Sequence, residues 1–219
     1  MSTKLSIVIL LFMAATFYPM TSHSLVFFEP GLGALSGDFD ADETTDGERF
    51  EHDALLFGVE VSARAGLNIF GFQVGGTASH QRTHMAATRE VKLSELHGSS
   101  YTNTLAISLT GLYAGLRLPN TSFRLMGELY TEAKLRLHYA KPKSANLFTN
   151  RDRMKGKGYG LGVGYLDKKN GSMISVLYRS LDFERFTNDG VQSNLPDGNL
   201  TRPHIDQIVL QITIFAHLP

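Results

Sequence analysis

Hydrophobic and polar residues alternate with a period of two along much of the chain. The clearest run covers residues 123–139, where every charged residue has one parity and the other parity carries none. A helix would spread these charges around its circumference, so the run is predicted to be a strand. It is far longer than the roughly 5–6 residues of a typical strand in a soluble protein.

Seven further segments follow the same template and are predicted to be strands. They cover residues 26–35, 55–67, 70–79, 104–118, 157–165, 173–182 and 207–215. In segment 104–118 the apolar parity changes between Leu109 and Leu112, which predicts a β-bulge near Thr110 and Gly111.

The connections between these segments alternate in length. Residues 37–54, 80–103, 140–156 and 183–206 form long polar gaps, whereas 68–69, 119–122 and 167–172 are short. This order is typical of a membrane barrel with long outer loops and short periplasmic turns. Because an open sheet edge cannot lie in hydrocarbon, the strands must close. We predict an all-β fold: a membrane-spanning, up-and-down antiparallel β-barrel of eight strands. The alternative is a soluble barrel with an apolar interior.

The N-terminal segment is predicted to be an export signal. Lys4 precedes an apolar run over residues 5–17, Pro19 ends the run, and Ser22 and Ser24 offer a cleavage site. The run would cover about 20 Å as a helix, less than the roughly 30 Å of a bilayer core. We expect residues 1–24 to be removed, which leaves residues 25–219 as a single barrel domain.

Composition narrows the possible functions. The chain has no cysteine, which excludes disulfides, thiolate metal sites and a cysteine nucleophile. Its formal net charge is +0, so no overall charge attracts nucleic acid. No nucleotide or zinc motif appears, and no cofactor is expected.

Four stretches carry a resemblance to a known family: residues 27–33, 62–67, 111–115 and 157–165. They resemble the small eight-stranded outer-membrane β-barrels of bacteria, among them the transmembrane domain of outer-membrane protein A and OmpX. The resemblance implies a monomer in the outer membrane of a Gram-negative bacterium, inserted by the barrel-assembly machinery and in contact with membrane lipid. Barrels of this family usually end on an aromatic residue that the machinery reads. This sequence departs from that pattern, since Phe215, which would serve here, is displaced by four residues.

The charged parity of the strands is expected to face the lumen. The predicted lumen residues are Glu29, Glu60, Arg64, Arg124, Glu128, Glu132, Lys134, Arg136 and Arg179. Eight strands enclose only enough space for side chains, and buried charges must be paired. We therefore predict a lumen plugged by ion pairs, with a narrow or gated pore as the alternative.

Two predicted outer loops carry charge of opposite sign. Residues 38–53 are acidic, and Asp42, Thr44, Asp46 and Asp53 have the spacing of a calcium-binding EF-hand loop. A solvated acidic loop is the simpler interpretation, since no helices flank this segment. The second loop is basic and can hold lipopolysaccharide phosphates, or be only a charged loop. Its basic residues are Lys141, Lys143, Arg151, Arg153, Lys155 and Lys157.

No enzymatic machinery is expected. His97 and Ser99 have the spacing found in lipid hydrolases of barrel type, but residues 106–118 contain no carboxylate to orient the base. The predicted function is therefore a structural and surface-interaction barrel that contacts lipopolysaccharide or external partners. A narrow pore is the alternative, and a lipid hydrolase is less favoured.

Overall fold

The computed structural model describes most of the chain after the predicted signal segment. The described residues are 26–45, 48–69, 71–91, 99–119, 121–138, 153–167, 169–188, 191–196 and 202–218. Residues 1–25 lie outside this set, so the cleaved signal peptide and the domain boundary at residue 25 stay predictions.

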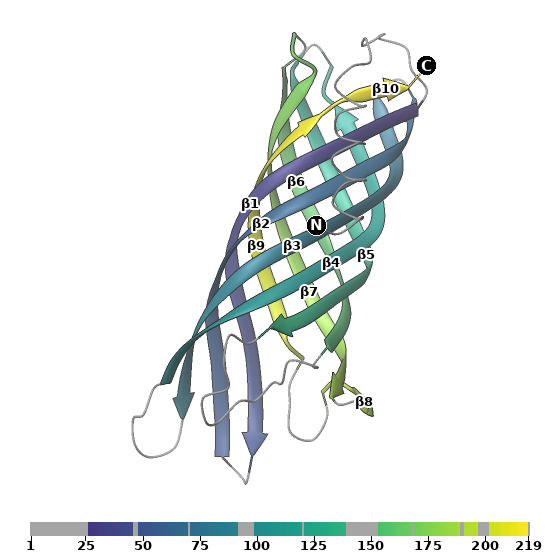
Figure 1. The fold of residues 1–219 in the computed structure, drawn as a ribbon. Coiled ribbons are helices and arrows are strands. Elements are labelled where there is room, and N and C mark those ends of the chain that lie inside the picture. Colours follow the sequence, from purple (N-terminus) through teal and green to yellow (C-terminus); the bar gives the residue numbers. More distant parts are fainter. Residues whose placement is uncertain are drawn as a thin grey trace, which may run out of the picture.

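Within the described residues, eight long antiparallel strands close into a barrel, and two short strands extend its ends (Figure 1). The long strands are β1 (Val26–Thr45), β2 (Glu48–Ile69), β3 (Phe72–Val91), β4 (Ser99–Arg117), β5 (Phe123–His138), β6 (Arg153–Asp167), β7 (Ser172–Asn188) and β9 (His204–Ile214). The short strands are β8 (Val191–Asn194), which pairs with β7, and β10 (Ala216–Leu218), which pairs with β1. The barrel closes because β9 pairs with both β7 and β1. The predicted fold class is confirmed.

The two ends of the barrel differ. Short connections join β2 to β3, β4 to β5 and β6 to β7 at one end, here called the turn end, where Val26 also pairs with Leu218. Gly71 and Gly171 adopt positive φ angles of 87° and 63° in two of these turns, a conformation that suits glycine. The opposite end, here called the loop end, carries the remaining connections (Figure 1).

The strands continue well beyond the predicted segments at the loop end. β1 and β2 pair without interruption from Val26 opposite Leu67 to Thr45 opposite Glu48. The prediction of a long loop over residues 37–54 is therefore wrong, and β3 and β4 likewise occupy most of the predicted gap 80–103. The physical reason is that acidic side chains face solvent on one side of this hairpin while small or apolar side chains such as Phe39 and Ala54 face inward.

The outward faces of the strands form an apolar belt. Outward side chains such as Leu32, Val59, Leu129, Leu161 and Leu210 are all more than half exposed. A soluble protein rarely exposes so continuous an apolar surface, and a lipid-facing barrel wall requires one. Among the described residues, no helix is long and apolar enough to cross a membrane.

The lumen is layered along the barrel axis. Along β5 from the turn end, the inward side chains run Arg124, Met126, Glu128 and Tyr130, and then only apolar residues follow. One apolar cluster, which includes Phe39, fills the loop end, and a second cluster, which includes Phe215, lies toward the turn end. Polar and charged side chains lie between these clusters.

A β-bulge in β5 decides which side chains reach the lumen. Thr110 and Gly111 of β4 pair with Glu132 and Tyr130, so the extra residue, Thr131, lies in β5. The pairing of β5 with β6 shifts at the same place, between Tyr130 and Ala133, both of which face inward. The prediction of a bulge in β4 that changes its inward face is wrong, because Leu109 and Tyr113 face inward with the same parity on either side of that position.

The bulge in β5 corrects part of the predicted lumen set. Because it moves the inward position from even to odd residues, Lys134 and Arg136 are exposed on the outer wall, and Glu132 lies beside them. Glu132 and Lys134 pair there at 2.6 Å between carboxylate and ammonium, with both side chains about half exposed. The prediction that Glu132, Lys134 and Arg136 face the lumen is wrong.

Candidate functional site: charged groups of the lumen and outer wall

Six of the nine predicted lumen residues are buried together inside the barrel. They are Glu29, Glu60, Arg64, Arg124, Glu128 and Arg179. Four strands contribute them, β1, β2, β5 and β7. Strands β3, β4 and β9 contribute neutral partners. The three carboxylates and three guanidinium groups sum to zero charge, which is the condition for burying so many ionisable groups in one layer.

Glu128 on β5 is the centre of this layer. Its Oε1 accepts a hydrogen bond from Arg64 Nε at 2.7 Å and one from Thr77 Oγ1 at 3.3 Å. Its Oε2 accepts from Arg179 Nη2 at 3.3 Å and from the hydroxyl of Tyr130. A carboxylate with two charged and two neutral donors is fully paired inside the lumen.

Glu60 on β2 forms the second centre. Both of its oxygens bond to the Arg179 guanidinium, in a two-point contact whose Nη2 to Oε1 distance is 3.1 Å. Gln81 Nε2 donates to Oε2 at 2.8 Å, and Gln211 Nε2 donates to Oε1 at 3.1 Å. Arg179 therefore links Glu60 to Glu128, and the two centres form one network.

Glu29 on β1 forms a third, separate pair toward the turn end. Its Oε1 lies 2.6 Å from Arg124 Nη1 and accepts from Gln73 Nε2 at 3.0 Å. The hydroxyl of Tyr113 donates to Gln73 Oε1 at 3.2 Å and so extends this group to β4.

Each buried arginine also lies over an aromatic ring. The guanidinium carbons are 5.1 Å from the ring centre for Arg64 and Tyr113, and 5.5 Å for Arg179 and Tyr130. For Arg124 the distance to the centre of the Phe215 ring is 4.6 Å. Such cation–π contacts add stabilisation once the cation is removed from water.

The wall of β6 makes room for these side chains. A Cβ at Gly160 would lie 3.2 Å from Arg179 Cγ and 3.3 Å from the Tyr130 hydroxyl oxygen. The inward glycine therefore allows Arg179 and Tyr130 to lie against the backbone of β6.

Sequence reasoning counted only charged residues and missed the neutral part of this site. Gln73, Gln81 and Gln211 share the inward parity of their strands, and so do Tyr113 and Tyr130. The inward parity of each strand would have identified them if it had been applied to every polar residue and not only to the charged ones.

The calcium candidate does not form the loop that its spacing implied. Asp42 and Thr44 lie in β1 and Asp53 in β2, where Asp53 is exposed opposite Asp40. Asp46 and the side chains of Asp42 and Thr44 lie outside the described residues. Within the part of the chain that the structure describes, no group of acidic and histidine residues has the geometry to hold a metal ion.

Half of the predicted basic loop belongs to a strand. Arg153, Lys155 and Lys157 lie on the outward face of β6 and are exposed. Lys141, Lys143 and Arg151 lie outside the described residues, and so does His97 of the hydrolase candidate.

A histidine with two carboxylate partners lies at the loop end of the outer wall, beyond the apolar belt. His204 Nδ1 is 2.7 Å from Asp182 Oδ1, and its Nε2 is 3.1 Å from Asp206 Oδ1. Partial burial opposes the positive charge of the imidazole, but the hydrogen bond to Asp182 and the negative charges of both aspartates raise the pKa of His204. On β1, burial and the charges of the neighbouring aspartates raise the pKa of Asp40.

Comparisons with known proteins support the fold. No protein-family model and no curated protein matches the sequence. Among solved structures, the outer membrane protein OprG from Pseudomonas aeruginosa is similar with a TM-score of 0.59 and 11% identity, over 90% of this chain and 98% of that one. Ail of Yersinia pestis matches with a TM-score of 0.44 and 14% identity over 86% and 98% of the two chains. The protease OmpT from Escherichia coli matches with 0.43 and 13% over 91% and 99%. The likeness to OprG shows that the chain has the fold of an outer-membrane β-barrel.

Proposed function

We propose that this protein is an outer-membrane β-barrel with a structural and surface-interaction role, whose lumen is closed by its buried ion pairs. The observation that carries the proposal is the neutral layer of three glutamates and three arginines across the lumen. An eight-stranded barrel is only wide enough for side chains to fill it, so paired charges there act as a plug.

The apolar clusters on both sides of the charged layer support a closed lumen. At the loop end, Phe39, Leu56, Leu105 and Phe183 are buried against one another, and Phe27 and Met173 are buried toward the turn end. An ion that crossed the barrel would have to leave water at both clusters, which is costly.

The surface role rests on the outer wall. Exposed basic side chains on β6, among them Lys155 and Lys157, border the apolar belt at the loop end. We propose that the loop end faces outward in the outer membrane of a Gram-negative bacterium, where these cations contact the phosphates of lipopolysaccharide. In this orientation Val26 and Leu218 are on the periplasmic side, where the barrel-assembly machinery would insert the protein as a monomer.

Conductance of the mature protein in planar bilayers tests the closed lumen. The preparation must first migrate faster on a gel when unboiled, as a closed barrel does. A silent bilayer is the expected result, and discrete openings of uniform size would refute the plug.

A narrow pore is the second candidate, because some buried polar atoms lack a hydrogen-bond partner among the described residues. They include Arg64 Nη1 and Nη2 and the hydroxyls of Thr83, Ser175 and Thr213. Unpaired polar atoms suit a hydrated path. If the bilayers conduct, the variant E128Q should change the unitary current, whereas the exterior variant K134Q should not.

We also propose that the protein is not an enzyme. Overexpression should leave the mass of lipid A unchanged, and a loss of one acyl chain would favour the lipid-hydrolase alternative.

A further inference from the structure

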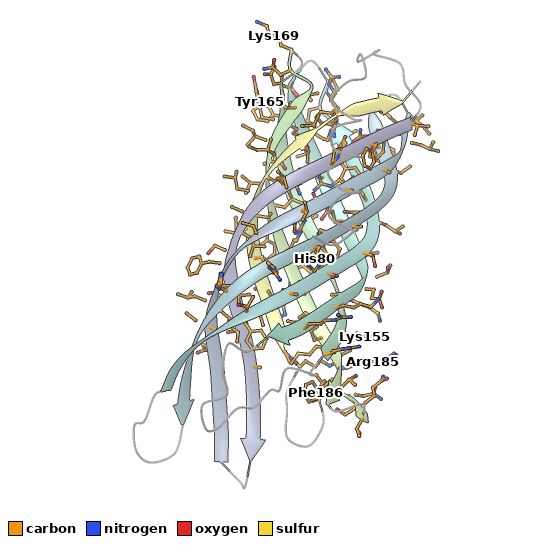
Figure 2. All side chains as sticks on the ribbon, in the orientation of Figure 1. His80, Lys155, Tyr165, Lys169, Arg185 and Phe186 are labelled. Atoms are coloured by element: carbon orange, nitrogen blue, oxygen red, sulfur yellow. The ribbon has the colours of Figure 1, made fainter. Side chains whose placement is uncertain are left out.

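The outer wall of β3–β7 carries two rows of mostly basic residues at the loop end that the ion-pair plug does not use. In the first row, Arg82, Ala106, Arg136 and Arg153 are consecutive cross-strand neighbours. The second row runs through His80, Ser108, Lys134, Lys155 and Arg185. Figure 2 shows Lys155 and Arg185 near the loop end, far from Lys169 and Tyr165 at the turn end.

Several like charges are direct neighbours in these rows. Arg136 pairs in register with Arg153, and Lys155 pairs with both Lys134 and Arg185. Like charges directly opposite each other destabilise a sheet. Of the nearby carboxylates, Glu132 is already bonded to Lys134 at 2.6 Å. The rows therefore keep an excess of positive charge that an anion would relieve.

The first row has a gap suited to one anionic group. Arg82 and Arg136 flank Ala106, so their backbones are about 10 Å apart, two strand spacings, with only a methyl group between them. Both side chains are exposed. Two guanidinium groups at this separation can each donate to one phosphate, the geometry that arginine favours. In the neighbouring second row, Ser108 Oγ is 2.9 Å from His80 Nδ1, so a polar pair borders this gap.

An apolar groove of about 730 Å³ lies on the same wall toward the turn end. The residues that line it include Ala114, Gly127, Leu67, Leu112, Leu129 and Leu161. A Cβ at Gly127 would meet only Leu161 Cδ2, at 4.0 Å, so the groove is open at this position.

The distance between the phosphate position and the groove matches one membrane leaflet. Ala106, which lies between the two arginines, and Ala114 are eight positions apart on β4, which corresponds to about 26 Å along the strand. At the usual tilt of roughly 35–45° this is about 20 Å along the membrane normal. Half of a bilayer of about 40–45 Å, headgroups included, has the same thickness.

We propose that the outward faces of β3–β6 bind one phosphorylated, acylated lipid. Its phosphate lies between Arg82 and Arg136, and one acyl chain follows β4 into the groove at Ala114 and Gly127. This inference rests on the proposed function, since it assumes that the loop end lies in the lipopolysaccharide leaflet. It adds a defined site to that general contact.

Native mass spectrometry of the mature protein in detergent, titrated with lipid A, tests this site. The charge variant is R82Q/R136Q, and its control is K169Q at the opposite end of the barrel. The groove variant is G127L, and its control is A34L, an exposed position on the outward face of β1. Phosphatidylethanolamine and inorganic phosphate, each added alone, separate the contributions of head charge and acyl chains.

The expected result is one lipid A bound per barrel, with an affinity at least tenfold lower in R82Q/R136Q and severalfold lower in G127L. Both controls should bind as the unmodified barrel does, and neither added probe should compete at equal concentration. Unchanged affinity in R82Q/R136Q or in G127L overturns the site. If lipid A still binds to either variant at full strength, the general lipopolysaccharide contact survives. If the unmodified barrel folds, is silent in bilayers and binds no lipid A, the site and the contact fail but the plug stands.

Discussion

Removing the Glu128 carboxylate is the sharpest test of the ion-pair plug. In the variant E128L, Arg179 keeps its two-point contact with Glu60. Arg64 loses its only carboxylate partner, because its ion pair with Glu128 at 2.7 Å is the one that it makes among the described residues. The layer then carries one uncompensated buried charge.

The expected cost follows from that charge. Breaking a buried ion pair by removing one partner costs about 3–5 kcal/mol. The contact of Arg64 with the Tyr113 ring, 5.1 Å away, is present in both proteins and does not change this difference. We therefore expect E128L to lower the free energy of unfolding by about 3–5 kcal/mol.

The double variant E128L/R64M removes both charges and replaces them with apolar side chains. Such replacements of whole buried pairs are often neutral, so most of the loss should be recovered. Urea unfolding of the refolded barrel, followed by gel mobility, measures the free energy of unfolding of the unmodified protein, E128L, R64M and E128L/R64M. K134M on the outer wall is the control and should cost no more than about 1 kcal/mol, because its pair with Glu132 is half exposed. A cost below about 1 kcal/mol for E128L, or additive costs for E128L and R64M, would refute the buried-pair reasoning.

Three further outcomes are expected. The variant R124A should lower the free energy of unfolding by about 3–5 kcal/mol, since it leaves a buried carboxylate unpaired, and an unchanged urea midpoint would contradict this. Because the pKa of His204 is raised, its stabilisation should be full below about pH 6.5 and lost as the pH rises through the folded-state pKa. An NMR titration of His204 should show this raised midpoint, and D182N should lower it. Finally, G160L should cost about 1–3 kcal/mol by pushing a side chain against the charged layer, whereas the outward G127L should fold normally, as unfolding in urea would show.

The strand pattern could be read from the sequence wherever one face meets lipid and the other meets the lumen. This holds for the turn-end half of β5, where Leu125 and Leu129 face outward while Arg124 and Glu128 are buried. The bulge between Tyr130 and Ala133 was not predictable from alternation, because the sequence pattern runs through it unbroken. Beyond the apolar belt the outward face becomes charged and the lumen apolar. The bulge in β5 lies at this boundary, so the charged residues that follow it face outward and the apolar residues face the lumen.

The acidic segment shows a related limit. Its many carboxylates suggested a loop, but apolar or small residues still occur at alternate positions, as with Phe39 and Ala41 inside β1. The many acidic residues made the segment look like a loop, although the alternation of inward and outward residues continues beyond the apolar belt. The calcium candidate was read from the same segment as a single loop, whereas Asp42 and Asp53 lie on two paired strands.

The layered lumen explains how a barrel with six buried charges can be both stable and closed. A charged layer open to water at either end would exchange its ion pairs for hydration, and salt would screen them. Here apolar clusters cover both ends, so the pairs interact at low dielectric and each arginine lies over an aromatic ring. The same clusters make any single unpaired charge costly, which is why the three glutamates and three arginines must balance. Added salt should therefore weaken the lipid contacts of the outer wall far more than the stability of the lumen.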